Sequence, residues 1–268
     1  MISNLYCKSL YTMPVDFIIT PIYEYDISKA NISILLSKGV ITKEQHKKFC
    51  EMSKQERQVK VGLMMRRNPD LIRVVEDGCC EARRNFVVSN DIQDDEIVSI
   101  RKDSLFITKQ VENVAFGDIR FVHKNTYSLM AKLGNLELYY YYDSISGFYN
   151  IDVKGIRDEL LVKHESSLLT ALCDIFYCVV DKRIHDAVKY VSTLANKYDT
   201  LNLPIEYYRE FNQSSLYRIM TNIGSVYYID EVTPEVIGCI DIRYNKQVMR
   251  DLVKLITKIY ITSVSRRK

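Results

Sequence analysis

The chain has 268 residues, of which 47% are hydrophobic and 26% charged, with a formal net charge of +3. It is long enough to bury one large core or two small ones, and its composition excludes low-complexity and collagen-like classes. Seven cysteines without framework spacing and four scattered histidines favour free thiols in a reducing cytosol over a zinc site. Because no apolar run approaches the roughly 20 residues that span a bilayer and no signal-peptide pattern opens the chain, we expect no membrane association.

The N-terminal third changes from strand to helix periodicity. Residues 15–25 are β-branched and aromatic, which predicts a strand bent at Pro21. Apolar positions then follow one helical face until Gly39, and Thr42 with Gln45 has the pattern of a capping box that opens a short polar helix. Further helices are predicted over residues 54–65 and 70–88.

The remainder divides into a strand-rich and a helix-rich part. Residues 96–108 are typical of strand–turn–strand, and further strands are predicted over 116–122, 136–142 and 148–153. Helical periods follow over 166–180, 184–198, 205–220 and 244–264, with a short strand at 225–229. The sequence therefore predicts an α+β protein with antiparallel strands, with a mixed domain over 1–155, a helical insert at about 40–68, and a mostly helical domain over 156–268.

Two aspartates lie at the ends or bends of predicted strands. Asp26 follows the first strand, and Asp103 lies at the bend of the 96–108 hairpin. Phosphoryl transfer by two metal ions needs carboxylates on neighbouring strands, and magnesium accepts a few carboxylates together with phosphate oxygens. Aspartate is also a common turn residue, which is the structural alternative for both positions. No GxxxxGK[ST], GxGxxG, GxSxG or HExxH pattern indicates another chemistry.

The sequence around these aspartates resembles the palm and thumb of family-B-like, phage-type DNA polymerases. The run from Asp26 through Ser28 into a helix resembles the first palm motif, and Arg101-Lys102-Asp103-Ser104 resembles the second. Residues 153–158 (VKGIRD) are similar to the segment that leads from palm to thumb, in which a lysine–glycine step contacts the primer duplex. The resemblance covers about residues 20–200 and gives three motifs in the expected order.

This resemblance implies a template-directed polymerase, either a minimal enzyme or one subunit of a split viral DNA polymerase. Asp26 and Asp103 would be catalytic ligands of Mg²⁺ or Mn²⁺, and Arg57 and Lys60, which share a helical face, would bind the triphosphate. Contacts with nucleic acid would come from Lys102, Ser104, Lys154 and Arg157. The implied partners are primer–template, dNTPs and further polymerase subunits, and the implied location is the host cytoplasm.

The sequence departs from the polymerase motifs in two ways, which leave other hypotheses about its function open. Arg101 stands where the second palm motif often carries another aspartate, and no fingers motif is clearly present. One alternative is a non-catalytic binding or assembly protein that keeps the palm-like fold. Another is a phage interaction protein of unrelated α+β fold, whose tyrosine run at 139–142 is the contact surface. Two basic clusters fit a nucleic-acid binder or a solvated surface: Lys54, Arg57, Lys60, Arg66 and Arg67, and the tail Arg266-Arg267-Lys268.

Overall fold

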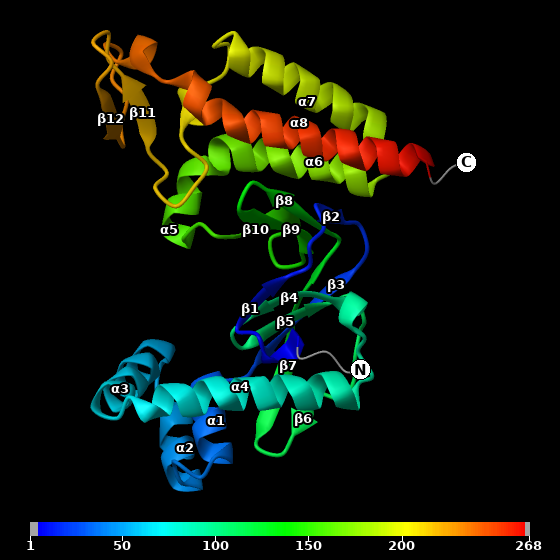
Figure 1. Ribbon diagram of the computed structural model, residues 1–268, viewed down its shortest axis with the longest axis vertical. Coiled ribbons are helices and arrows are strands. Elements are labelled where there is room, and N and C mark those ends of the chain that lie inside the picture. The colour runs from blue at the N-terminus through cyan, green and yellow to red at the C-terminus, as the bar shows by residue number, and fades with distance from the viewer. Residues whose placement is uncertain (1–4, 266–268) are drawn as a thin grey trace. The chain divides into compact units, whose positions relative to one another are not determined.

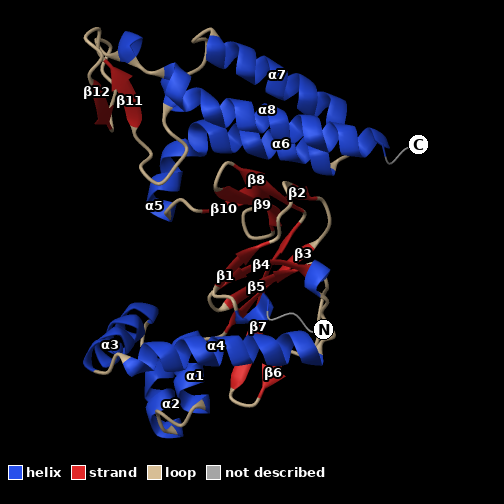
Figure 2. Ribbon diagram, in the orientation of Figure 1, coloured by secondary structure: helices blue, strands red, loops and turns tan. Residues whose placement is uncertain are grey.

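The computed structural model describes residues 5–265, with the side chains of 243–245 excepted, and divides into two compact units (Figure 1). The first unit holds the described residues up to Pro14 together with Pro21–Thr126, and the second holds Val15–Thr20 and the chain from Tyr127 onward. Each unit combines helices with antiparallel strands (Figure 2). The predicted α+β class is confirmed.

The first unit is built on a six-stranded sheet in which sequence neighbours are not always spatial neighbours. Its order is β1 (Leu10–Thr12), β4 (Ile97–Arg101), β5 (Ser104–Ile107), β3 (Ile22–Ile27), β7 (Ile119–Tyr127) and β6 (Ala115–Phe116). The β4–β5 hairpin is the predicted strand–turn–strand segment. Its second strand, β5, pairs with β3, which comes earlier in the chain. Four helices separate β3 from β4 in sequence, so the hairpin returns to β3 after a long excursion.

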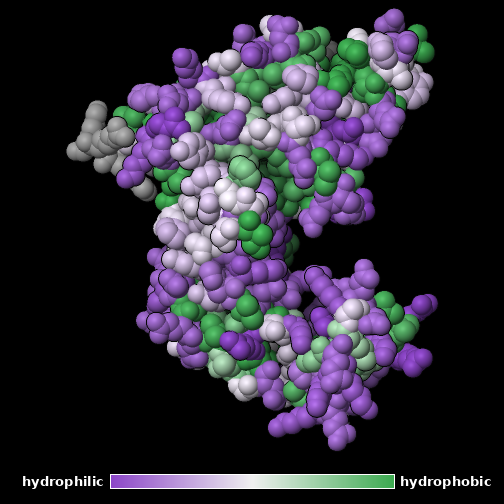
Figure 3. Space-filling model, turned by 180° about the vertical axis from the view of Figure 1, so that it is seen from behind, coloured by the Kyte–Doolittle hydropathy of each residue, from purple (hydrophilic) through white to green (hydrophobic). Residues whose placement is uncertain are grey.

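Four α-helices lie between β3 and β4, and two of them begin at side-chain caps. They are α1 (Ala30–Ser37), α2 (Lys43–Glu51), α3 (Lys54–Arg67) and α4 (Asp70–Ser89). The predicted capping box of Thr42 and Gln45 opens α2, and Ser53 with Glu56 forms a second box at α3. Helix α4 packs Phe86 against Phe121 of the sheet, with ring centroids 4.3 Å apart. Helices α2 and α3 bury few residues, and their surface is mostly hydrophilic (Figure 3, lower right).

The second unit packs a four-stranded sheet against long helices. The sheet order is β10 (Phe148–Lys154), β9 (Leu136–Asp143), β8 (Leu129–Leu133) and β2 (Phe17–Ile18). The helices are α5 (Asp158–Leu161), α6 (Thr170–Val180), α7 (Ile184–Asp199) and α8 (Ile242–Ser265), and β11 (Tyr217–Met220) pairs with β12 (Val226–Ile229). Its short helical turns are η3 (Val162–His164), the π-turn η4 (Glu165–Leu169), η5 (Ile205–Tyr208) and η6 (Ile237–Cys239). The first unit has the short turns η1 (Leu5–Cys7) and η2 (Asp94–Glu96).

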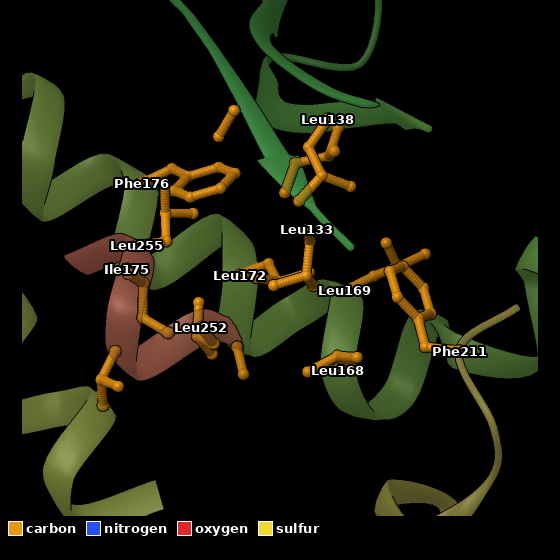
Figure 4. Packing of buried hydrophobic residues seen from close by; sticks show 14 of the residues in the cluster. Leu133, Leu138, Leu168, Leu169, Leu172, Ile175, Phe176, Phe211, Leu252 and Leu255 are labelled. Carbon is orange, nitrogen blue, oxygen red and sulfur yellow. The ribbon is translucent and has the colours of Figure 1, made fainter. Parts of the chain in front are cut away.

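The core of the second unit explains why the predicted domain boundary near residue 155 differs from the observed one. Leu133 and Leu138 of the sheet face Phe176 of α6 and Leu255 of α8 in one buried cluster (Figure 4). Strands β8 to β10 therefore bury their apolar face on helices that follow them, and the division falls at Thr126–Tyr127 instead. Burial of this face outweighs the change in local periodicity that suggested residue 155.

The local structure differs from the sequence prediction at two further places. The sequence does not predict strand β8, because none of its five residues (LMAKL) is β-branched or aromatic. The helix predicted over 205–220 is replaced by η5, a turn and β11. In that turn the Asn212 side chain accepts hydrogen bonds from the backbone amides of Ser214 (2.8 Å) and Ser215 (3.2 Å), which compete with helix formation.

The tyrosine run lies in β9 and is partly structural. Tyr139 and Tyr140 are fully buried, whereas Tyr142 is exposed. Tyr139 donates a hydrogen bond to Glu137 (2.9 Å), and Tyr140 stacks on Tyr149 of β10. The inner half of the run therefore contributes to the core of the second unit, and only its outer end is available as a surface.

Two glycines in neighbouring helices give a matched test of packing in the first unit. A Cβ at Gly78 of α4 would overlap Ile34 of α1, whereas a Cβ at Gly62 of α3 would meet no atom within 4 Å. We expect Gly78→Ala to destabilise the fold by about 1–3 kcal/mol through overpacking. Gly62→Ala should stabilise it by about 0.5–1 kcal/mol, because glycine is a poor helix former.

Urea unfolding followed by circular dichroism measures both changes. Equal shifts of the two midpoints, or a stabilised Gly78→Ala variant, would contradict the close packing of α4 on α1.

Candidate active site

The pairing of β3 with β5 brings the two predicted aspartates together. Asp26 lies opposite Ser104 in the antiparallel register, so Asp103 follows directly beyond the pair. The amide of Ile27 donates to the carbonyl of Asp103 (3.1 Å), and the Ser104 hydroxyl donates to Oδ1 of Asp26 (2.9 Å). Both aspartates line the same cavity of the first unit. Two residues 77 positions apart thus form one carboxylate pair.

A buried arginine fixes the hairpin bend that carries Asp103. Arg83 of α4 is only 2% exposed, and its guanidinium donates to the carbonyls of Tyr6 (2.8 Å), Lys8 (3.1 Å) and Lys102. Lys102 itself has a left-handed backbone with φ of 51°. Because a left-handed lysine is strained, the charge-assisted hydrogen bond at its carbonyl helps to hold the bend.

The aspartate pair carries the electrostatic signature of two like charges placed close together. Burial raises the pKa of Asp103, and the neighbouring Asp26 carboxylate raises it further. Lys124 of β7 supplies the opposing charge, with its Nζ 3.3 Å from Asp26 and 3.7 Å from Glu24. Burial lowers the pKa of Lys124, but the Glu24 and Asp26 carboxylates outweigh this effect and the pKa is raised overall.

Glu24 and Lys124 were not predicted as site residues. Glu24 precedes Asp26 by two positions on β3, so it lies on the same face of the sheet, and it is 2% exposed. This alternation is a signal that the sequence contained. Lys124 offers no such signal, because its position beside Asp26 depends on β7 pairing with the other edge of β3.

The cavity beside the aspartates has a volume of about 300 Å³ and a basic side. Lys29 at the start of α1 and Lys54, Arg57 and Gln58 of α3 line it. Positions 54, 57, 58 and 61 form one stripe on a helix, so α3 turns this stripe toward the aspartates. The predicted Arg57 lies in the wall, whereas Lys60 lies off the stripe and is exposed. Lys54 replaces Lys60 in this set.

The other predicted nucleic-acid contacts are divided between the two units. Lys102 is exposed at the hairpin bend, and Ser104 is bonded to Asp26 as described above. Lys154 and Arg157 belong to the second unit. Lys154 pairs with Asp152 (2.5 Å), and Arg157 pairs with Glu159 (3.5 Å). The basic tail at 266–268 lies outside the described residues.

The donor set fits a hard divalent cation that also binds phosphate. Among the described residues, no group of three or more His, Cys, Asp or Glu side chains is arranged to hold a metal ion by itself. Asp26 and Asp103 provide two carboxylates, and magnesium in phosphoryl-transfer sites usually completes its shell with water and substrate oxygens. The described cysteines are unpaired thiols. No helix in the described chain is long and apolar enough to cross a membrane.

These observations define an α+β protein with a carboxylate pair and a basic cavity on an antiparallel sheet. A family model described as "Bacteriophage PBS1 gene 130 protein" matches residues 1–259, so the chain belongs to this family. The protein is therefore viral, and the family description states no activity. No curated protein matches the chain.

Because the pKa of Asp103 is raised, we expect removal of its charge to increase the stability of the fold by an amount that depends on pH. A carboxyl whose pKa is higher in the folded state stabilises the fold below its unfolded pKa, and this contribution is lost as pH rises through the folded pKa. Asp103→Asn should therefore melt above the wild type at pH 7, and the difference should shrink as the pH falls toward 4.

Thermal melts at pH 4 to 8 test this, with Asp118→Asn as the control because Asp118 is exposed. If the difference in melting temperature is constant across this range, or if the control shows the same trend, the pKa of Asp103 is not raised in the folded protein.

Proposed function

We propose that this protein is a template-directed nucleic-acid polymerase, either a minimal enzyme or the palm-and-thumb subunit of a split viral DNA polymerase. One observation carries the proposal. Asp26 of β3 and Asp103, in the turn directly before the neighbouring strand β5, line a cavity that is also lined by Lys29, Lys54 and Arg57. Nucleotidyl transfer requires this combination of carboxylates for metal ions and cations for a triphosphate.

The residues of the first unit support distinct parts of such a reaction. Asp26 and Asp103 would hold Mg²⁺ or Mn²⁺, which when bound would lower the pKa of the primer hydroxyl and neutralise charge on the phosphoryl oxygens. Ser104 orients Asp26 through its hydrogen bond. Arg57 and Lys54 would bind the triphosphate, and α1, which begins at the cavity without a side-chain cap, adds its positive end.

The second unit would hold the nucleic acid. Lys154 and Arg157, together with Lys102 and Ser104 of the first unit, are the proposed contacts with primer–template. Contacts of this kind depend on salt and not on sequence. The remaining partners in this proposal are dNTPs and further polymerase subunits, and the site of action is the host cytoplasm.

A non-catalytic relative that keeps the same fold is the second candidate. Lys124 already neutralises Asp26 and Glu24 within the protein, as an internal cation does in a site that no longer binds metal. Such a protein would bind nucleic acid or polymerase subunits without extending a primer.

Primer extension with magnesium and four dNTPs distinguishes the two candidates. We expect extension by the wild type and a loss of at least 1,000-fold (~4 kcal/mol in transition-state stabilisation) in Asp26→Asn and in Asp103→Asn, because each removes a metal ligand. Circular dichroism checks folding of both variants. Extension that survives both substitutions would overturn the assigned site, and binding of primer–template without extension in magnesium or manganese would favour the non-catalytic candidate.

The two faces of α3 allow a sharper test of the triphosphate site. Arg57 lines the cavity, whereas Arg66 is exposed on the same helix and is not part of its wall. A charge-assisted hydrogen bond is worth about 1.5–3 kcal/mol, so Arg57→Ala should raise the KM for dNTP by about tenfold or more. Arg66→Ala should leave it unchanged. Equal effects of the two substitutions on steady-state kinetics would remove Arg57 from the site.

A further inference from the structure

A band of partly exposed tyrosines crosses the second unit, and none of its residues belongs to the proposed polymerase site. Helix α6 contacts both β10 and α7, so these elements lie side by side (Figure 1). Together with β9 and η5, each contributes one ring to the tyrosine band: Tyr142 (β9), Tyr149 (β10), Tyr177 (α6), Tyr190 (α7) and Tyr207 (η5). The first four are between 36% and 54% exposed. Exposed tyrosines that gather in one place are typical of interaction surfaces.

The rings at the strand end of the band are held in place by one another and by the core. Tyr149 contacts both Tyr142 and Tyr177, with ring centroids 5.2 Å and 5.6 Å apart. It also stacks on the buried Tyr140, with centroids 5.1 Å apart and planes 5° from parallel. Because the rings are fixed in this way, little ordering would be needed when a ligand binds.

At the α7 end of the band, two of its rings line a cavity of about 420 Å³. Tyr190 and Leu194 of α7 form one part of the wall, and Leu203 and Tyr207, which follow α7 in the chain, form another. The Tyr190 hydroxyl donates to Asp174 of α6 (3.3 Å), which helps to hold the ring. The volume is in the range of cavities that bind small molecules, and a wall of aromatic and aliphatic side chains suits a flat ring.

The acids beside the helical part of the band are engaged within the protein. Arg183 pairs with Asp181 (2.8 Å) and Asp186 (3.3 Å), and its guanidinium lies 5.3 Å from the ring centroid of Tyr177. Asp174 accepts the hydroxyl of a band tyrosine, as described above. Asp186 is the only acid among the described residues that line the cavity. The part of the band on α6 and α7 therefore carries little uncompensated negative charge.

Two lysines of α7 supply positive charge at the cavity. Lys189 and Lys197 line it, are exposed, and make no ion pair or side-chain hydrogen bond with a residue that the structure describes. They lie eight positions apart on the helix, about 12 Å along its axis. This spacing suits a ligand with several phosphates, and the band continues to Tyr142, beyond the reach of a single nucleotide in the cavity.

We infer that the tyrosine band binds single-stranded nucleic acid. Unpaired bases stack on aromatic side chains whatever their identity, and neighbouring lysines attract the phosphates. In a duplex the bases are stacked on one another, so their faces are not available to the rings. Within the proposed function the band would hold the unpaired template strand, and this assignment rests on that function. Binding of a single strand by itself does not.

Fluorescence anisotropy of a labelled oligothymidylate, of about 20 nucleotides, with the full chain measures this binding. We expect the oligothymidylate to bind at least about tenfold more tightly than a duplex of the same length. Tyr177→Leu removes one stacking ring and should weaken binding at least about fivefold. Tyr227→Leu is the matched control, because Tyr227 of β12 is similarly exposed but lies outside the band, and it should leave the affinity unchanged.

Tyr190 allows the ring and the hydroxyl to be tested separately. Tyr190→Phe keeps the ring and should bind the oligothymidylate as the wild type does. Tyr190→Leu loses the ring and should weaken binding as Tyr177→Leu does. Circular dichroism checks that the variants fold, so that a loss of affinity in a folded variant reports on stacking.

The salt dependence of binding tests the two lysines by a readout that a merely structural role would not change. The double variant Lys189→Gln/Lys197→Gln should reduce the slope of log K against log salt by about 1.4, since each phosphate contact of a single strand contributes about 0.7. The double variant Lys254→Gln/Lys258→Gln is the control. It removes the same charge from exposed positions of α8 and should leave the slope unchanged.

Four results would overturn the inference. They are no binding of the oligothymidylate by the wild type, tighter binding of the duplex, equal effects of Tyr177→Leu and Tyr227→Leu, and displacement of the oligothymidylate by an equal concentration of thymidine monophosphate, which would assign a free nucleotide instead. Failure of the proposed function looks different. Asp26→Asn and Asp103→Asn should abolish primer extension without weakening oligothymidylate binding, because neither aspartate belongs to the band.

Discussion

The antiparallel pairing of β3 with β5 is the constraint on which the first unit depends. The register sets Asp26 opposite Ser104 and therefore beside Asp103, so two carboxylates must share a half-buried position. Burial and, after it, repulsion by the Asp26 carboxylate raise the pKa of Asp103, which reflects the cost of this arrangement. The surrounding contacts offset it: Lys124 opposes the charge, Ser104 donates to Asp26, and Arg83 holds the hairpin bend. Strain of this kind is characteristic of functional sites.

The helical excursion between β3 and β4 adds the other half of the site. Because α3 begins at a capping box, the phase of the helix is fixed at Ser53, and this phase turns Lys54 and Arg57 toward the aspartates. Acids and bases from segments far apart in sequence thus line one cavity, although Lys124 already pairs with Asp26 from the neighbouring strand. A wall that carries both signs of charge suits a ligand that carries both, such as a metal-bound triphosphate.

Membership of a phage family establishes that the protein is viral but leaves its activity to be argued from the site. Folds host many unrelated functions, so the α+β architecture alone does not favour an enzyme over a binding protein. The two proposed binding surfaces differ in chemistry. The cavity beside Asp26 combines acids with lysine and arginine, whereas the tyrosine band of the second unit combines aromatic rings with two lysines. They share no residue, so strand binding and nucleotidyl transfer can be tested independently.

The sequence by itself determined the α+β class, the polar helix opened by Thr42 and Gln45, the β4–β5 hairpin and the candidacy of Asp26 and Asp103, because these depend on periodicity and turn chemistry within short segments. Only the tertiary structure decided that β8 to β10 join the later helices, that Lys54 rather than Lys60 lines the cavity, and that Lys124 lies beside Asp26. Glu210, within a predicted helix, became a buried acid in a turn. These features depend on strand partners, helix phase and burial against distant segments, which local sequence patterns do not encode.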